Sequence, residues 1–129
     1  MLNKNEIAKT FLNTIKEKAL KSFNETNFIK YLDACDEIDR SDLQDKDRLK
    51  DTHFLLFLVK MKILRNDTHD CFITIDKENI FLENKKIKNN IDYDLLEDLC
   101  KESGIYTFYK TEGDLSSIYF STSRKRKRY

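Results

Sequence analysis

The sequence predicts an α+β domain with three N-terminal helices followed by a small antiparallel sheet in ββ-α-ββ order. Three observations support this prediction. The first half repeats apolar residues at helical spacing, residues 54–64 form one long apolar run, and apolar and polar residues alternate after a polar cluster at 66–70. We expect one domain with a disordered basic tail, divided as follows: domain 1–121, helical half 4–65, ββαββ half 70–121, tail 122–129.

The first two predicted helices are amphipathic. In the segment 4–22, Ile7 and its helical neighbours form one apolar face, and lysines occupy the other face. Asn24 and Glu25 interrupt the pattern, after which Thr26 or Asn27 can cap a second helix. The buried stripe of that helix consists of Phe28, Tyr31, Leu32, Cys35 and Ile38.

The central run 54–64 fits two kinds of secondary structure. Ser41-Asp42-Leu43-Gln44 has the pattern of a capping box, which favours a helix that begins there and continues through the run. The alternation of Leu55, Phe57 and Val59 also fits a central strand. We favour the helix, because the capping box has no role in a strand.

The segment after the polar cluster predicts a hairpin. Cys71, Ile73 and Ile75 alternate with more polar residues and indicate a strand. A turn at 76–79 leads to a second strand at 80–83. We expect 84–90 to be a polar connection, in which Ile87 could continue the sheet.

The last third predicts a capped helix and a second hairpin. Asp92 can cap a helix that runs to Ser103, and Gly104 can end it in the left-handed conformation. Two strands follow, at 105–110 and 115–121. We expect one side of this hairpin to face the core and the other to face away, with these assignments: Tyr106, Phe108, Ile118 and Phe120 inward, Tyr109 and Tyr119 outward.

The charge of the chain is divided unevenly. The net charge is +1, but five of the 24 basic residues are consecutive near the C-terminus. The other 19 basic residues face 23 acidic residues, which leaves about −4 on the rest of the chain. The basic run can contact nucleic acid through its phosphates or act as a nuclear-localisation signal. It consists of Arg124, Lys125, Arg126, Lys127 and Arg128.

The composition indicates an intracellular protein from an AT-rich genome, such as that of a bacterium, a parasite or a virus. Proline is absent, there are two glycines, and the three cysteines are too few and too scattered for a disulfide framework. The N-terminus has no apolar signal segment, and the run 54–64 is too short to span a bilayer. We expect the nucleus as the location in a eukaryotic host, and otherwise the cytoplasm.

No motif indicates an enzyme. The two isolated glycines cannot form a phosphate-binding loop, and we expect no cofactor, no metal and no small-molecule substrate. His69 and Cys71 could form a nucleophile and base, which is a remote alternative. Tyrosines on the last hairpin could stack single-stranded bases, but we expect Tyr106 and Phe108 to be core residues because only Lys110 adds charge among them.

These observations predict a small accessory protein whose body binds a protein partner or a second copy of itself and whose tail contacts nucleic acid. A pure interaction module, an inhibitor of viral origin or an assembly subunit is the alternative. The helix 92–103 is acidic and unsuited to a duplex, so it favours a protein partner. The candidate partner-binding residues are Tyr109, Tyr119, Asp94, Glu97 and Asp98.

Overall fold

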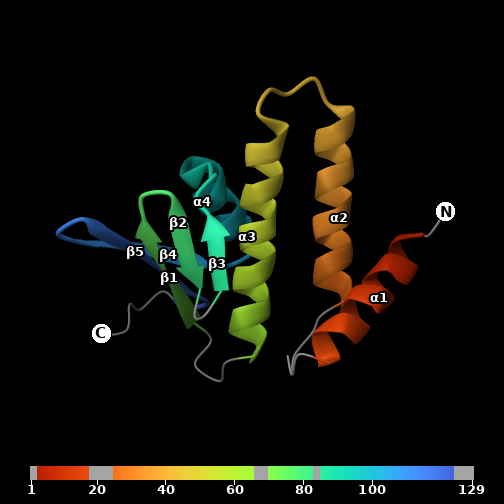
Figure 1. The fold of residues 1–129 in the computed structure, drawn as a ribbon, viewed down its shortest axis with the longest axis horizontal. Coiled ribbons are helices and arrows are strands. Elements are labelled where there is room, and N and C mark those ends of the chain that lie inside the picture. Colours follow the sequence, from red (N-terminus) through yellow and green to blue (C-terminus); the bar gives the residue numbers. More distant parts are fainter. Residues whose placement is uncertain (1–2, 18–24, 66–69, 83–84, 124–129) are drawn as a thin grey trace.

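The fold packs one long helix and one shorter helix against one face of a five-stranded sheet, and two further helices lie outside the long one (Figure 1). The computed structural model describes residues 3–17, 25–65, 70–82 and 85–123. The expected α+β class is correct, because helices and an antiparallel sheet occur together in one fold. The elements are α1 (Lys4–Glu17), α2 (Glu25–Arg40), α3 (Lys46–Arg65), β1 (Asp70–Asp76), β2 (Asn79–Leu82), β3 (Lys85–Lys88), α4 (Tyr93–Glu102), β4 (Tyr106–Glu112) and β5 (Leu115–Ser121).

Helix α3 lies between α2 and the sheet (Figure 1). The apolar run is therefore helical, and the strand alternative for 54–64 is wrong. Because α3 has neighbours on both sides, it needs apolar residues around most of its circumference. Leu55 and Val59 belong to the core against the sheet, whereas Phe57 and Met61 pack with α1 and α2.

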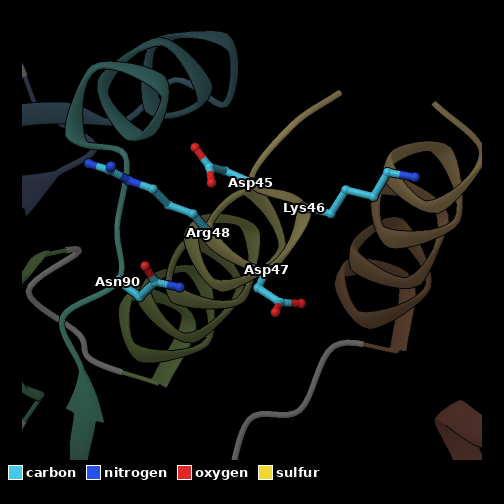
Figure 2. Close-up of a pocket in the computed structure, with 5 residues that line it drawn as sticks. All are labelled: Asp45, Lys46, Asp47, Arg48 and Asn90. Carbon is cyan, nitrogen blue, oxygen red and sulfur yellow. The ribbon is translucent and has the colours of Figure 1, made fainter. Parts of the chain in front are cut away.

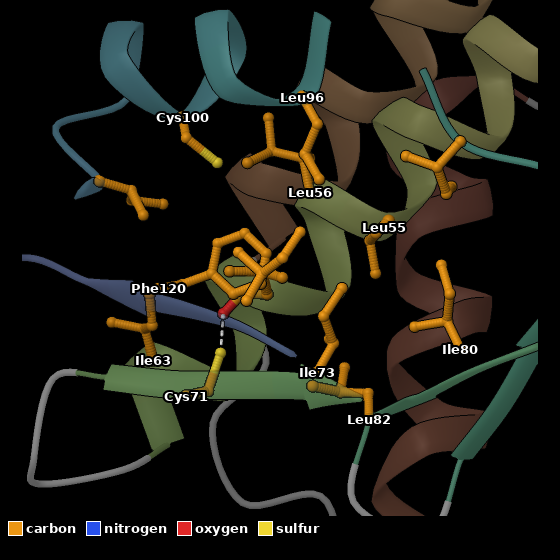
Figure 3. Packing of buried hydrophobic residues seen from close by; sticks show 14 residues of the cluster. Leu55, Leu56, Ile63, Cys71, Ile73, Ile80, Leu82, Leu96, Cys100 and Phe120 are labelled. Carbon is orange, nitrogen blue, oxygen red and sulfur yellow. Dashed lines mark hydrogen bonds between the residues drawn. The ribbon is translucent and has the colours of Figure 1, made fainter. Parts of the chain in front are cut away.

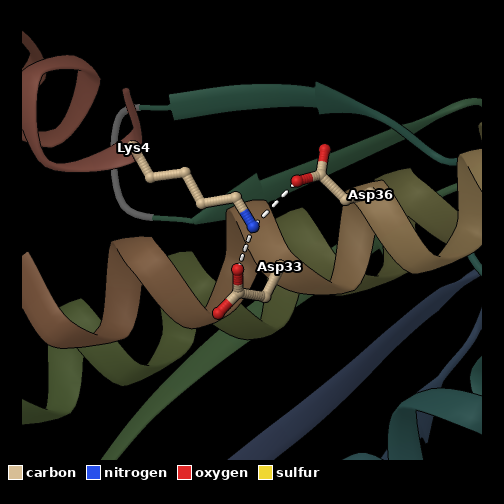
Figure 4. Close-up of polar contacts among 3 residues, drawn as sticks. All are labelled: Lys4, Asp33 and Asp36. Carbon is tan, nitrogen blue, oxygen red and sulfur yellow. Dashed lines mark hydrogen bonds and ion pairs between the residues drawn. The ribbon is translucent and has the colours of Figure 1, made fainter. Parts of the chain in front are cut away.

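The first helices are confirmed in outline. Part of the predicted helix 4–22, residues 18–22, lies outside the described residues. Helix α2 begins at Glu25, so Thr26 and Asn27 lie inside its first turn and neither is the predicted cap. Lys4 of α1 forms ion pairs with Asp33 and Asp36 of α2 (Figure 4).

The predicted capping box is wrong. Helix α3 begins at Lys46, so Ser41 lies in the loop that precedes it. The Ser41 hydroxyl donates to the Ile38 carbonyl at 2.6 Å and accepts from the Leu43 amide at 3.3 Å. It therefore provides a hydrogen bond to a carbonyl in the last turn of α2 and does not cap α3. Asp45 starts the new helix, because its carbonyl accepts from the Leu49 amide at 3.1 Å.

The sheet is antiparallel throughout, in the order β3-β2-β1-β5-β4. Both predicted hairpins are present, but the predicted ββ-α-ββ order lacks one strand. Residues 85–88 form β3, which pairs with β2 through Ile80 and Ile87. The three lysines of this strand concealed it in the sequence, because an edge strand needs few inward apolar residues and often has charged side chains.

Helix α4 is confirmed with both of its predicted ends. The Asp92 carboxylate accepts from the Leu95 amide at 3.2 Å, and Gly104 has a φ of 74°. Helices α3 and α4 cover the same face of the sheet. The main core lies between these two helices and the sheet (Figure 3). Its buried members are Leu55, Leu56, Val59, Ile63, Cys71, Ile73, Ile80, Leu82, Ile91, Leu96, Cys100, Ile105, Ile118 and Phe120.

The predicted facing of β4 is wrong. Phe108 is paired with Tyr119, and Thr107 is paired with Phe120. Residues opposite each other on neighbouring strands point to the same face of a sheet. Phe108 therefore lies on the face away from α3, and so does Tyr106, which is two residues away on the same strand. The two-residue turn between Glu112 and Leu115 sets this register, and a one-residue change would reverse it.

Candidate functional site

The face of the sheet opposite α3 and α4 is rich in aromatic residues. None of its described aromatic side chains belongs to either buried cluster. We call this surface the open face. Its side chains come from alternate positions of all five strands: Phe72, Thr74 and Asp76 (β1), Asn79 and Phe81 (β2), Lys86 and Lys88 (β3), Tyr106, Phe108, Lys110 and Glu112 (β4), Leu115, Ser117 and Tyr119 (β5).

Three aromatic residues form a row across the middle of the open face. Phe72 pairs with Tyr119, which pairs in turn with Phe108 on the edge strand β4. The ring centroids of Phe72 and Tyr119 are 5.4 Å apart and the rings are tilted by 35°. Phe72 is 51% exposed, so one ring of this contact is open to solvent. The row extends over three adjacent strands.

The next row along the strands places basic residues beside the aromatic row. It runs from Lys110 through Ser117, Thr74 and Phe81 to Lys86, so a lysine stands at each end. Acidic groups partly balance this charge. Lys110 forms an ion pair with Glu112 at 2.9 Å, and the exposed Asp76 and the buried Asp70 of β1 lie on the same face. The open face is thus an aromatic surface with mixed charge at its border.

The predicted partner-binding residues lie on two different surfaces. Tyr119 is on the open face, whereas Tyr109 is paired with Ile118 on the face of α4. Burial, followed by the charge of Glu97, raises the pKa of the Tyr109 hydroxyl. Glu97 also pairs with Lys101 at 3.7 Å, one turn further along α4. Asp94 and Asp98 are exposed on the same helix.

The sequence interpretation missed Phe72 and Phe81. The signal was present, because Phe72 stands between Cys71 and Ile73 and must face the opposite side of a strand from both. The predicted nucleic-acid residues Arg124, Lys125, Arg126, Lys127 and Arg128 lie outside the described residues. They follow β5 in the sequence, and β5 supplies Tyr119.

Of the two residues in the remote alternative of a Cys-His pair, the structure describes Cys71, and His69 lies outside the described residues. Cys71 is buried, and its thiol is directed at the Val59 carbonyl with the sulfur and oxygen 4.0 Å apart (Figure 3). Burial raises the pKa of the Cys71 thiol to about 12, as it does for Cys100. A thiol with so high a pKa is a poor nucleophile at neutral pH.

We expect Cys71 and Cys100 to resist thiol reagents in the native protein at pH 8. The buried thiols stay protonated there, because their pKa values lie well above the pH of the assay. The absorbance released from Ellman's reagent would measure this, with a Cys35→Ser variant used to remove the half-buried third thiol. Both remaining thiols should react at once in denaturant. Rapid reaction of either in the folded variant would contradict the expectation.

A polar hollow of about 320 Å³ lies at the start of α3 and is lined by five polar residues (Figure 2). Two of these form contacts that connect α3 to the segment before α4. The Arg48 guanidinium donates to the Ile91 carbonyl at 3.2 Å, and the Asn90 amide donates to Asp51 at 2.9 Å. We therefore assign the hollow a structural role. Its lining is Asp45, Lys46, Asp47, Arg48 and Asn90.

The described residues contain no group of three or more His, Cys, Asp or Glu side chains suited to a metal ion. In the same part of the chain, every helix is too short or too polar to cross a membrane. Comparisons with protein-family models, with curated proteins and with solved structures find no match to this chain. The open face therefore has to be interpreted from its own chemistry.

Proposed function

We propose that this chain is a small non-catalytic accessory protein that binds single-stranded nucleic acid on the open face. The row of Phe72, Tyr119 and Phe108 is the main support. Aromatic rings on an antiparallel sheet stack unpaired bases in several RNA-binding modules. Each stacked base contributes about 1–3 kcal/mol, with little dependence on sequence.

The charges around the row support the same ligand. Lys110 and Lys86 lie in the next row, where they can contact phosphates on either side of stacked bases. The basic run that starts three residues after β5 supplies further positive charge. In a nucleated host the same run has the composition of a nuclear-localisation signal. Acidic residues such as Asp76 reduce the attraction between the open face and the phosphates of the ligand. We therefore assign most of the electrostatic attraction to the basic run 124–128.

A Phe72→Ala variant tests the proposal. We expect its dissociation constant for a fluorescent oligothymidylate to rise about 5- to 150-fold, which corresponds to one lost stacking contact of about 1–3 kcal/mol. Fluorescence anisotropy on the full chain measures this change. Tyr109→Ala is the matched control, because Tyr109 is 50% exposed on the other face and Phe72 is 51% exposed. If Phe72→Ala and the unmodified chain bind the oligothymidylate with equal affinity, the proposal is wrong.

A protein partner on α4 is the second candidate. Tyr109 stands close to Glu97 and Asp94, so an exposed aromatic ring there has an acidic border. Such a surface suits a basic protein segment and repels phosphates. If Tyr109→Ala weakens recovery of a partner and leaves oligothymidylate binding intact, both surfaces function separately. Partner recovery and oligothymidylate binding, measured on the same Tyr109→Ala variant, thus distinguish the two candidates.

A further inference from the structure

A cleft between α2, α3 and the end of α4 brings basic side chains together. Its volume is about 190 Å³. Lys30 of α2 and Lys60 of α3 line it, together with His53, which lies two turns before Lys60 on the same helix. The aromatic ring of Tyr31 and the apolar side chain of Leu56 form part of its wall.

Among the described residues, no acidic side chain lies within ion-pair distance of either lysine. Within the described ranges, neither Lys30 nor Lys60 takes part in an ion pair. Burial, and then the charge of Lys30, lower the pKa of Lys60. Two carboxylates lie nearby: Glu102 lines the cleft, and Glu37 acts on His53. Among the charged groups that shift the pKa of Lys60, Lys30 lowers it and Cys100 raises it, and neither carboxylate is one of them.

We infer that this cleft binds a small oxyanion of the phosphate class between Lys30 and Lys60. An anion between two ammonium groups removes their repulsion and accepts hydrogen bonds from both. Tyr31 and Leu56 cover one side of the cleft, whereas Lys30 is exposed to solvent. The volume is below the roughly 300–1,000 Å³ of pockets for drug-sized ligands, so a single phosphate group fits better than a larger molecule.

This inference is independent of the proposed function, because the cleft lies among the helices and the open face is on the far side of the sheet. The phosphate group could belong to the free ion or to an organic phosphate. The same phosphate group would contact the lysines in both cases. The experiment therefore includes both ligands, inorganic phosphate and glycerol phosphate. The ligand with the lower dissociation constant identifies the source, and binding of either one in the cleft supports the inference.

A Lys60→Met variant tests the site, because methionine keeps the length of the side chain and removes its charge. Amide NMR shifts of the full chain, titrated with each phosphate at constant ionic strength, measure the dissociation constant. We expect shifts around Lys30 and Lys60, and at least tenfold weaker binding by Lys60→Met. Lys50→Met is the control, because Lys50 lies on the same helix but pairs with Asp39 at 2.5 Å.

A second readout separates a binding site from a merely structural lysine. Without phosphate, Lys60→Met should melt at a higher temperature than the unmodified chain, since a half-buried ammonium beside a second one is removed. Phosphate should then raise the melting temperature of the unmodified chain more than that of Lys60→Met. The inference is overturned if neither phosphate shifts the cleft amides, or if both proteins bind phosphate equally.

Discussion

Removal of residues 124–129 is expected to weaken binding to single-stranded nucleic acid and to flatten its dependence on salt. The segment holds five consecutive basic residues. Each phosphate neutralised on a single strand adds about −0.7 to the slope of log affinity against log salt, so five contacts add about −3.5. Between 50 and 200 mM salt the full chain should therefore lose about a hundredfold more affinity than the truncated chain.

Anisotropy of a labelled oligothymidylate across a salt series measures both slopes. A chain in which the five basic residues are replaced by glutamine is the matched control, because it keeps the length of the tail. It should behave like the truncated chain. Combining the truncation with Phe72→Ala should give nearly additive losses, because charge and stacking act at separate positions on the strand. An unchanged salt slope after truncation would exclude the tail as a phosphate contact.

Substitution of Phe120 by alanine is expected to lower the free energy of unfolding by about 3–5 kcal/mol, as for other fully buried phenylalanines. Phe120 has no exposed surface and points from β5 into the core beneath α3 and α4 (Figure 3). Domains of this size have a total stability of about 5–15 kcal/mol, so much of it would be lost. Urea unfolding followed by circular dichroism measures the change.

Phe72→Ala is the matched control for this stability experiment. Phe72 follows Cys71, the partner of Phe120 in the neighbouring strand, and faces the opposite side of the sheet. Its truncation should cost about 1 kcal/mol or less, because an exposed ring loses little burial. If Phe120→Ala does not fold, Phe120→Leu keeps the comparison measurable. Equal costs at the two positions would contradict the assignment of the two faces, and the proposed binding surface with it.

The separation of the two faces explains why the sequence favoured a different interpretation of the aromatic residues. Tyr106 and Phe108 were expected in the core because only Lys110 adds charge among the aromatic residues of this hairpin. The register of the β4–β5 hairpin places both on the open face instead. That register follows from the pairing of Glu112 with Leu115 across a two-residue turn, whereas the sequence predicted strands that stop at 110 and resume at 115.

The sequence by itself determined the local elements with strong periodic or capping signals. Asp92 and Gly104 delimited α4, the alternation around Ile73 indicated β1, and the apolar run 54–64 indicated a buried element. These features depend on neighbours within a few residues, which a single sequence contains. The same local information was misleading at Ser41, whose hydroxyl donates to the Ile38 carbonyl at the end of α2 and does not cap α3, which begins at Lys46.

Only the tertiary structure decided which residues share a surface. Phe72 and Phe108 are 36 positions apart and meet in one row because β5 joins β1 in the sheet. Lys30 and Lys60 line one cleft because α2 and α3 are side by side (Figure 1), and the end of α4 adds Glu102 to its lining. Such pairings depend on strand order and helix packing, in which the free energy comes from contacts between distant segments, so the local pattern of the chain does not contain them.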